Sequence, residues 1–164
     1  MSIKPEPSQS LRICLLGYRS HPYGGGQGVY LKYLSQALVS MGHQVDVISG
    51  QPYPHLSDEV TLIKLPGLNL YENGLGSLKL KHLTSWANIV EWCSKLTGGF
   101  AEPYSFGRRV NAYLKKHGHH YDIIHDNQSL SKSSLSIQAR QPFVMTIHHP
   151  VTRDFRIALD ACAT

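Results

Sequence analysis

The fold is decided by the stretch LRICLLGYRSHPYGGGQGVYLKYLSQALVSMG, residues 11–42. Residues 11–17 form a short, nearly continuous apolar run, which is typical of a strand buried on both faces of a parallel sheet. In residues 28–41 the apolar side chains recur every three or four positions, which predicts an amphipathic helix that ends at Gly42. The polar, glycine-rich segment 18–27 joins the two. The sequence therefore opens with a strand, a loop and a helix, the unit that begins a doubly wound fold.

The rest of the chain alternates between the same two patterns. We expect further strands at 43–49, 60–65, 121–125 and 143–147, helices at 78–96, 103–117, 131–139 and 154–163, and a loop at 66–76. Such alternation, with right-handed crossovers, predicts an α/β fold with a doubly wound, mainly parallel, Rossmann-like sheet. We expect residues 1–10 to be a disordered tail and residues 11–164 to form one domain, because this length suits a single core.

Composition narrows the classes of partner. Hydrophobic residues make up 41% of the chain and charged residues 16%, which favours a globular domain over disorder. The formal net charge of +5, with 10 histidines besides, favours anionic partners such as nucleotides, sugar phosphates or acidic lipid headgroups. Lysine and arginine are spread thinly along the chain, so we expect no nucleic-acid partner. The 3 cysteines are widely spaced, which predicts reduced, buried thiols.

The location of the protein is predicted from its apolar segments. The first ten residues lack the apolar core of a signal peptide, and no stretch approaches the ~18 apolar residues of a membrane span. We therefore expect a cytoplasmic protein, and peripheral contact with the inner membrane face stays open as an additional feature.

Ligands of a doubly wound fold bind beyond the carboxyl ends of its strands. Three polar segments of the sequence have that position: 18–27, 125–131 and 146–150. The glycine run at 24–26 would let a ligand approach the backbone, and the N–H groups at a helix start favour phosphate. The alternative is a flexible turn that only joins the strand to the helix.

Other phosphate-binding and metal-binding motifs fit less well. The glycine run is contiguous, unlike the G-x-G-x-x-G of dinucleotide sites, and Asp46 lies inside a predicted strand rather than at its end. The Gly-Lys-Ser or Gly-Lys-Thr of a P-loop does not occur. The histidines of the segment HGHH, 117–120, follow a predicted helix on the opposite side of the sheet, where cationic groups favour the helix dipole over a metal site.

Three motifs together resemble those of the family 4 glycosyltransferases. They are PYGGG at 22–26 with the helix and strand that follow it, YDIIH at 121–125, and FVMTIH at 143–148. The resemblance implies the N-terminal, acceptor-side half of a GT-B enzyme that takes a nucleotide-sugar donor, retains the anomeric configuration, and needs no metal or other cofactor. It also implies that the donor is held mainly by a C-terminal domain, which has no counterpart in this chain.

The resemblance further implies a set of site residues. The expected binding residues for donor or acceptor are Gly24, Gly25, Gly26, Gln27, Arg19, His21, His125 and Asp126. His148 would lie in the cleft between the domains and is expected to be catalytic, together with Asn127. Many members have a functional histidine where this chain has Asn127, and an amide can hydrogen-bond a sugar hydroxyl but cannot share a proton near neutral pH. A structural hydrogen bond is the alternative for His148, and a solvated loop position is the alternative for Arg19 and His21.

Two functions follow from the sequence. In the first, the chain is half of an enzyme that transfers sugar to a small-molecule or lipid acceptor when a donor-binding domain is present in the same or a separate chain, and it is inactive alone. In the second, it is a non-catalytic acceptor-binding or scaffold module. In both cases we expect the loops after the first, fourth and fifth strands to be exposed, and the sheet to be incomplete relative to the full enzyme.

Overall fold

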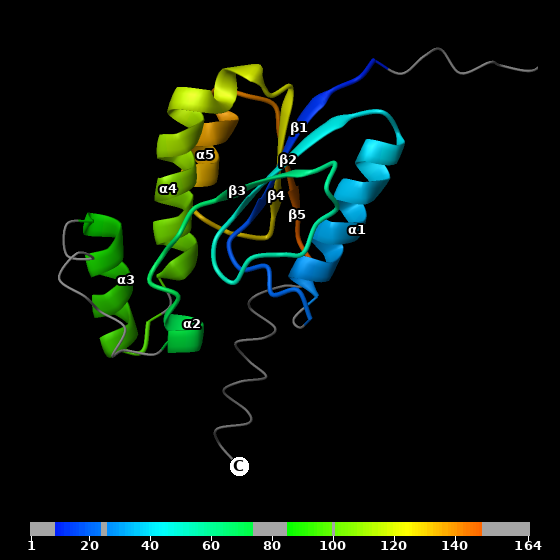
Figure 1. Ribbon diagram of the computed structural model, residues 1–164. Helices are drawn as coiled ribbons and strands as arrows, with labels where there is room; N and C mark the ends of the chain where they lie inside the picture. Colours follow the sequence, from blue (N-terminus) through cyan, green and yellow to red (C-terminus); the bar gives the residue numbers. More distant parts are fainter. Residues whose placement is uncertain (1–8, 24–25, 74–84, 100, 149–164) are drawn as a thin grey trace, which may run out of the picture.

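The computed structural model describes residues 9–23, 26–73, 85–99 and 101–148. At its centre is a five-stranded sheet in the order β3-β2-β1-β4-β5, in which every adjacent pair is parallel (Figure 1). The strands are β1 (Arg12–Gly17), β2 (Gln44–Ser49), β3 (Thr61–Lys64), β4 (Ile123–Asn127) and β5 (Phe143–Thr146). This order and direction confirm the doubly wound parallel sheet that the sequence predicts.

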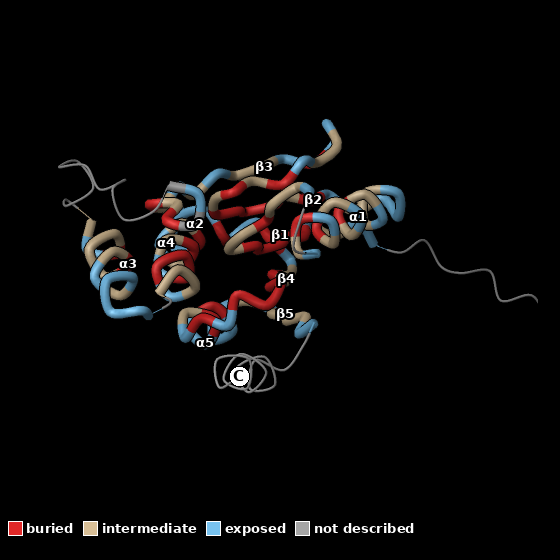
Figure 2. The backbone as a smooth tube through the Cα atoms, turned by 90° about the horizontal axis from the view of Figure 1, so that it is seen from below, coloured by how far each residue is buried: buried red, intermediate tan, exposed pale blue. Residues whose placement is uncertain are grey.

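Helices cover both faces of this sheet. α1 (Gln27–Ser40) lies on one face, and α4 (Glu102–His117) and α5 (Ser133–Gln138) lie on the other (Figure 1, Figure 2). α3 (Trp86–Leu96) packs against α4, away from the sheet, and the single turn α2 (Leu70–Asn73) follows β3. Within the described residues no helix combines the length and the apolarity that a membrane crossing requires.

The apolar core has two halves that are separated by the sheet. Successive side chains of β1 point to opposite faces, so that Ile13 and Leu15 pack with Leu31 of α1 while Cys14 and Leu16 pack with α4 and α5. All four of these β1 side chains are buried, which is the pattern of a central strand in a parallel sheet. The apolar run at 11–17 is thus explained by burial on both sides.

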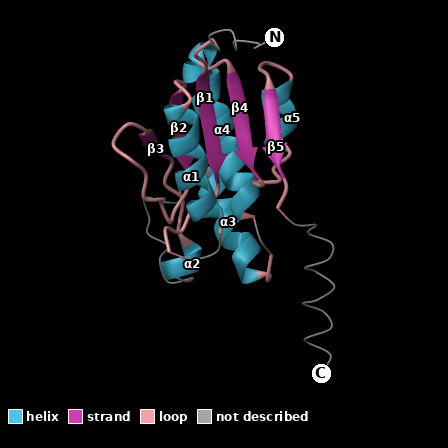
Figure 3. Ribbon diagram, turned by 90° about the vertical axis from the view of Figure 1, so that its right-hand side faces the viewer, coloured by secondary structure: helices cyan, strands magenta, loops and turns pink. Residues whose placement is uncertain are grey.

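The strand order changes direction beside β1. β2 and β3 extend the sheet on one side of β1, and the chain then crosses to β4 and β5 on the other side. The carboxyl ends of the strands all point the same way (Figure 3), and Leu16 of β1 pairs with Asp126 of β4. The ends of β1 and β4 are therefore adjacent at the switch point, where ligands of such folds bind.

β4 differs from its expected range. The sequence predicts a strand at 121–125, but the structure places it at Ile123–Asn127, so that the polar residues His125, Asp126 and Asn127 belong to the strand. Pairing with β1 and β5 on either side holds these residues in the strand. The strand therefore extends into residues that have no apolar pattern of their own. Tyr121 lies before the strand, and its hydroxyl donates to Oδ2 of Asp46 over 2.6 Å.

Two further expectations need correction. The segment 66–76, expected to be a loop, contains the turn α2, whose Leu70 is buried in the protein. α4 ends at His117, and the short 3-10 helix η3 (Gly118–His120) follows it. Cys14 is buried and free as expected, but the free thiol of Cys93 is exposed. The expected helix at 154–163, residues 78–84 of another and Cys162 lie outside the described residues.

Gly28 in the first turn of α1 allows the loop after β1 to fold back onto the helix. A Cβ atom at Gly28 would lie 2.3 Å from the carbonyl oxygen of His21 and 2.5 Å from that of Ser20. Both contacts are with backbone atoms, which cannot move aside as a flexible side chain can. A residue with no side chain is therefore required where the loop meets the helix.

We predict that Gly28→Ala lowers the free energy of unfolding by about 1–3 kcal/mol through this overlap. Helix propensity alone gives the opposite sign, a gain of about 1 kcal/mol, so the direction of the change separates the two effects. Urea unfolding followed by circular dichroism measures it. Val29→Ala, at the exposed neighbour, should stay within about 0.5 kcal/mol of the unchanged protein, and an equal or greater stability of Gly28→Ala would contradict the packing argument.

Candidate active site

Three segments that are far apart in the sequence meet at the carboxyl ends of β4 and β5. The Nδ2 atom of Asn127 donates to the carbonyl oxygen of Gln27 at the start of α1, over 3.3 Å. The Oδ1 atom of Asn127 lies 2.6 Å from Nε2 of His148, and the backbone N–H of His148 donates to Oε1 of Gln128 over 2.8 Å. The helix start and both strand ends are thus joined by side-chain hydrogen bonds.

A second set of contacts continues this group along the α1 face of the sheet. The hydroxyl oxygen of Thr146 lies 2.7 Å from Nε2 of His125 and 3.3 Å from the hydroxyl oxygen of Tyr30. The ring of Tyr30 meets the ring of His148 edge-on, with centroids 4.7 Å apart. We call the seven residues of the two sets the strand-end cluster: Gln27, Tyr30, His125, Asn127, Gln128, Thr146 and His148.

His125 is placed to stay neutral. Burial lowers the pKa of His125 because it disfavours the charged ring, and the neighbouring His148 acts in the same direction. A neutral imidazole can accept one hydrogen bond and donate another. The cluster therefore presents uncharged donors and acceptors at this position rather than a fixed positive charge.

The loop after β4 has a constrained backbone. Gln128 and Leu130 have φ angles of 52° and 49°, in the left-handed region that side chains other than glycine rarely adopt. The carboxylate of Asp126 accepts from both the backbone N–H and the hydroxyl of Ser129, over 3.3 and 2.7 Å. These two bonds fix the turn that directs Gln128 toward His148. Such constrained loops are common at functional sites.

The expectation that the loops after the first, fourth and fifth strands are exposed is wrong for the fourth. Gln128, Ser129 and Ser131 are buried, and only Leu130 of that loop is exposed. The loop is covered because α4 approaches it closely: a Cβ atom at Gly107 would lie 2.0 Å from Oγ of Ser131. After β5, Ile147 and His148 are exposed as expected.

Asp126 faces the other side of β4, away from the strand-end cluster. Its side chain is fully buried, and burial raises the pKa of Asp126 to about 6, although the hydrogen bonds from Ser129 act in the opposite direction. The folded protein thus keeps a proton that the unfolded chain releases between about pH 4 and 6. The contribution of Asp126 to stability is accordingly fully present below this interval and is lost as the pH rises through it.

We predict that Asp126→Asn, which removes this titration, gains stability relative to the unchanged protein as the pH rises from about 4 to 6.5, by about 2–3 kcal/mol at most. Urea unfolding at a series of pH values gives the difference between the two proteins, in which the contributions of the histidines cancel. Two parallel stability curves would show that Asp126 does not titrate in this interval. Asp122→Asn, at an exposed aspartate, is the matched control.

Two of the other expected site residues, Arg19 and His21, contact residues outside this cluster. Arg19 forms an ion pair with Glu102 at the start of α4. Nδ1 of His21 accepts from the backbone N–H of Tyr23, whose exposed ring also contacts His55. Gly26 precedes α1 with a φ angle of 68° and is exposed, and Gly24 and Gly25 lie outside the described residues.

No group of three or more histidine, cysteine, aspartate or glutamate side chains suited to a metal ion occurs within the ranges that the structure describes. The exposed His119 and His120 stack edge-on, with ring centroids 4.3 Å apart, beside the end of α4. They lie before the start of β4, whereas the strand-end cluster lies at the carboxyl ends of the strands.

Comparison with known proteins identifies the family. The model of Glycosyltransferase Family 4 matches residues 24–161. An MMP alpha-(1->4)-mannosyltransferase of Mycolicibacterium hassiacum is 39% identical over 155 residues, which are 92% of this chain and 38% of that protein. The chain belongs to Glycosyltransferase Family 4. It spans 38% of the length of this relative, so the family 4 domain described here corresponds to part of such a protein.

Among solved structures, the family 4 domain is similar to LpCGTa, whose crystal structure was determined in complex with UDP. The TM-score is 0.46 and the sequence identity 17%, over 83% of this chain and 29% of that chain. The Rossmann-like architecture of the domain is established by its own strand order and by the parallel pairing of its strands.

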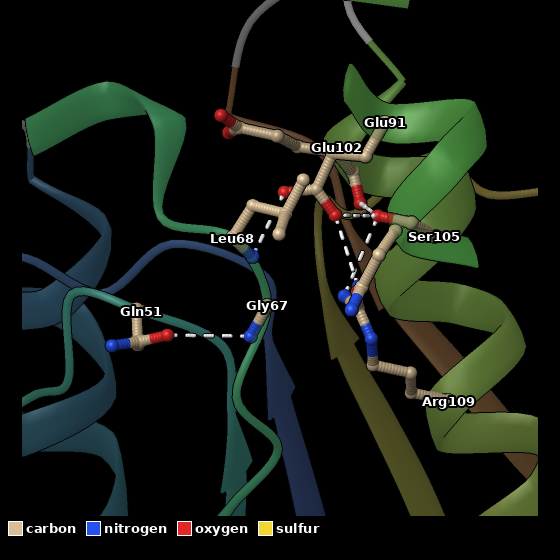
Figure 4. A network of polar contacts seen from close by, with 8 residues as sticks. Gln51, Gly67, Leu68, Glu91, Glu102, Ser105 and Arg109 are labelled. Carbon is tan, nitrogen blue, oxygen red and sulfur yellow. Dashed lines mark hydrogen bonds and ion pairs between the residues drawn. The ribbon is translucent and has the colours of Figure 1, made fainter. Parts of the chain in front are cut away.

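The family 4 domain also contains a buried polar network that the sequence does not reveal. Glu91 of α3 accepts from the backbone N–H of Leu68, from the hydroxyl of Ser105 over 2.7 Å and from Nη2 of Arg109 over 3.0 Å (Figure 4). The side chain of Glu91 is only 4% exposed. The network ties α3 and α4 to the loop after β3, where Gln51 also accepts from the N–H of Gly67.

We predict that Glu91→Ala lowers the free energy of unfolding by about 3–5 kcal/mol, because it leaves the largely buried guanidinium of Arg109 without its carboxylate. Thermal or urea unfolding measures the loss, and Glu59→Ala, at an exposed glutamate, is the control. In the double variant Glu91→Leu with Arg109→Met, much of the stability should return. A loss below about 1 kcal/mol in Glu91→Ala would mean that the pair is screened as at a surface.

Proposed function

We propose that this family 4 domain is the N-terminal, acceptor-side part of a retaining, metal-independent GT-B glycosyltransferase. It would transfer a sugar from a nucleotide-sugar to an acceptor when a donor-binding domain, in the same or a separate chain, completes the cleft. The observation that carries the proposal is the strand-end cluster, which joins the start of α1 to the ends of β4 and β5 at the switch point of the sheet.

The chemistry of the cluster favours an acceptor over a diphosphate. Its seven side chains are amides, imidazoles and hydroxyls, and none is a lysine or an arginine. Arg19, the cation of the loop after β1, is paired with Glu102. Neutral donors and acceptors of this kind suit the hydroxyl groups of a carbohydrate, whereas a donor diphosphate would call for positive charge. The donor would therefore be held mainly by the second domain.

The relative suggests the class of sugar. It is named an α-(1→4)-mannosyltransferase, and 38% of its length is matched by this chain. We therefore propose mannosyl transfer to a mannose-containing acceptor, with the catalytic role at His148 and with the unmatched part of such proteins supplying the donor domain. A cytoplasmic location, with peripheral membrane contact where the acceptor is a lipid, belongs to the same proposal. In this function the isolated chain binds acceptor but does not turn over.

The isolated ¹⁵N-labelled chain tests this. We predict that α-(1→4)-linked mannose oligosaccharides shift the amide signals of Thr146 and His148, that nucleotide-sugars shift them less, and that no transfer product forms from the two together. His148→Ala should weaken sugar binding about tenfold or more, the effect of losing one hydrogen bond of about 1.4 kcal/mol. His55→Ala, at an exposed ring away from the cluster, should not.

The other outcomes are equally informative. Transfer of sugar by the isolated chain would show that it is catalytically complete and would refute the need for a donor domain. Absence of any shift with mannose oligosaccharides or nucleotide-sugars, in a chain whose amide spectrum is that of a folded protein, would favour the scaffold module.

A further inference from the structure

We propose that Asn127 is a positioning residue that holds the imidazole of His148 in a single tautomer, with hydrogen on Nε2 and the lone pair on Nδ1. The use of that lone pair rests on the function proposed above, whereas the tautomer follows from the hydrogen bonds alone. The two parts of the proposal can therefore fail separately.

The first step fixes which end of the Asn127 amide faces His148. One end of the amide lies 3.3 Å from the carbonyl oxygen of Gln27. A backbone carbonyl can only accept a hydrogen bond, so the amide nitrogen must lie on that side. The amide oxygen then lies on the other side, 2.6 Å from Nε2 of His148. The position of Gln27 at the start of α1 thus determines the orientation of the amide.

The second step uses the orientation of the amide to determine which nitrogen of His148 carries a hydrogen. The Oδ1 atom of Asn127 can only accept, so Nε2 of His148 must carry a hydrogen and donate it. A neutral imidazole has one N–H group, which leaves Nδ1 as the acceptor. Asn127 is 1% exposed, and water therefore has little access to replace either of its hydrogen bonds.

The third step fixes the direction in which Nδ1 points. The backbone N–H of His148 donates to Oε1 of Gln128, whose own backbone is held in the left-handed region. The ring of Tyr30 lies edge-on to the imidazole, at an interplanar angle of 81°. His148 is thus held through its backbone N–H, at Nε2 and by the ring contact with Tyr30. A 180° rotation about χ2, which would put Cε1 in the place of Nε2, would break the bond to Asn127.

The consequence concerns the acceptor. His148 is exposed, and Nδ1 has no hydrogen-bond partner among the described residues. In the proposed function this lone pair accepts a hydrogen bond from a hydroxyl group of the acceptor sugar. A neutral amide suits this arrangement, because it fixes the tautomer without the negative charge by which a carboxylate would favour the doubly protonated ring.

Nuclear magnetic resonance of the chain with ¹⁵N-labelled histidine tests the tautomer, at about pH 8 where ordinary histidines are neutral. We expect His148 to show the signals of a ring protonated on Nε2, and this proton to exchange slowly with water. In Asn127→Ala we expect the exchange to become at least tenfold faster and the two nitrogen shifts to approach each other. Exchange is the more sensitive reading, because a free imidazole already prefers hydrogen on Nε2.

Three comparisons separate positioning from a general loss of structure. Asn127→Asp keeps an oxygen that can accept from Nε2, so it should restore slow exchange. Nδ1 of His43 accepts from the backbone N–H of Leu11 over 3.3 Å, so His43 should show the same tautomer in every variant and serves as an internal reference. Asn111→Ala, at an amide on α4 that contacts Arg140, is the matched control and should leave His148 unchanged.

Hydrogen on Nδ1 of His148 in the unchanged protein would overturn the proposal whether or not any variant folds. Unchanged exchange in a folded Asn127→Ala would also overturn it. If the tautomer is as stated but mannose oligosaccharides fail to shift the His148 signals, the positioning by Asn127 stands and the proposed function is refuted.

Discussion

The pairing of β4 beside β1 is the constraint on which the candidate site depends. β1 is paired with β2 on one side, so a strand that returns from the far edge of the sheet can join it only on the other side. This places the end of β4 next to the loop and helix start that follow β1, with Asn127 within hydrogen-bonding distance of Gln27. Thr146 at the end of β5, and His148 just after it, lie at the same end of the strands. Residues about a hundred positions apart meet because of the crossover, and no local preference of the chain would bring them together.

Glycines support the carboxyl ends of the strands in two ways. Only one of these two ways involves backbone conformation. Gly26 has a positive φ and precedes α1, as a residue without a side chain can at little cost. Gly28 and Gly107 instead give room: the first lets the loop after β1 lie against α1, and the second lets Ser131 lie against α4. The loops at the ends of β1 and β4 are therefore set by helices that approach them closely. A cluster that depends on bonds of 2.6 to 3.3 Å requires such fixed supports.

Much of the fold could be predicted from the sequence, because the apolar run at 11–17 and the helical spacing at 28–41 reflect burial directly. The ends of β4 could not, because His125, Asp126 and Asn127 are held in the strand by neighbours on both sides rather than by their own preference. The positions of Asn127 and His148 at neighbouring strand ends were foreseeable, but the carbonyl of Gln27 carries no sequence signal. Neither does Glu91, whose burial depends on partners from α4 and from the loop after β3.

The absence of lysine and arginine from the strand-end cluster bears on which half of such an enzyme would bind the acceptor and which would bind the donor. A positive group near His125 and His148 would hold a phosphate, but it would also compete for the lone pairs that the cluster offers to hydroxyl groups. The cluster instead uses burial to keep His125 neutral and an amide to orient His148. Two cations near the same end of the strands are paired with carboxylates, Arg19 with Glu102 and Arg109 with Glu91. In the function proposed for this domain, the charge that a nucleotide diphosphate requires is accordingly the contribution of the other half of the cleft.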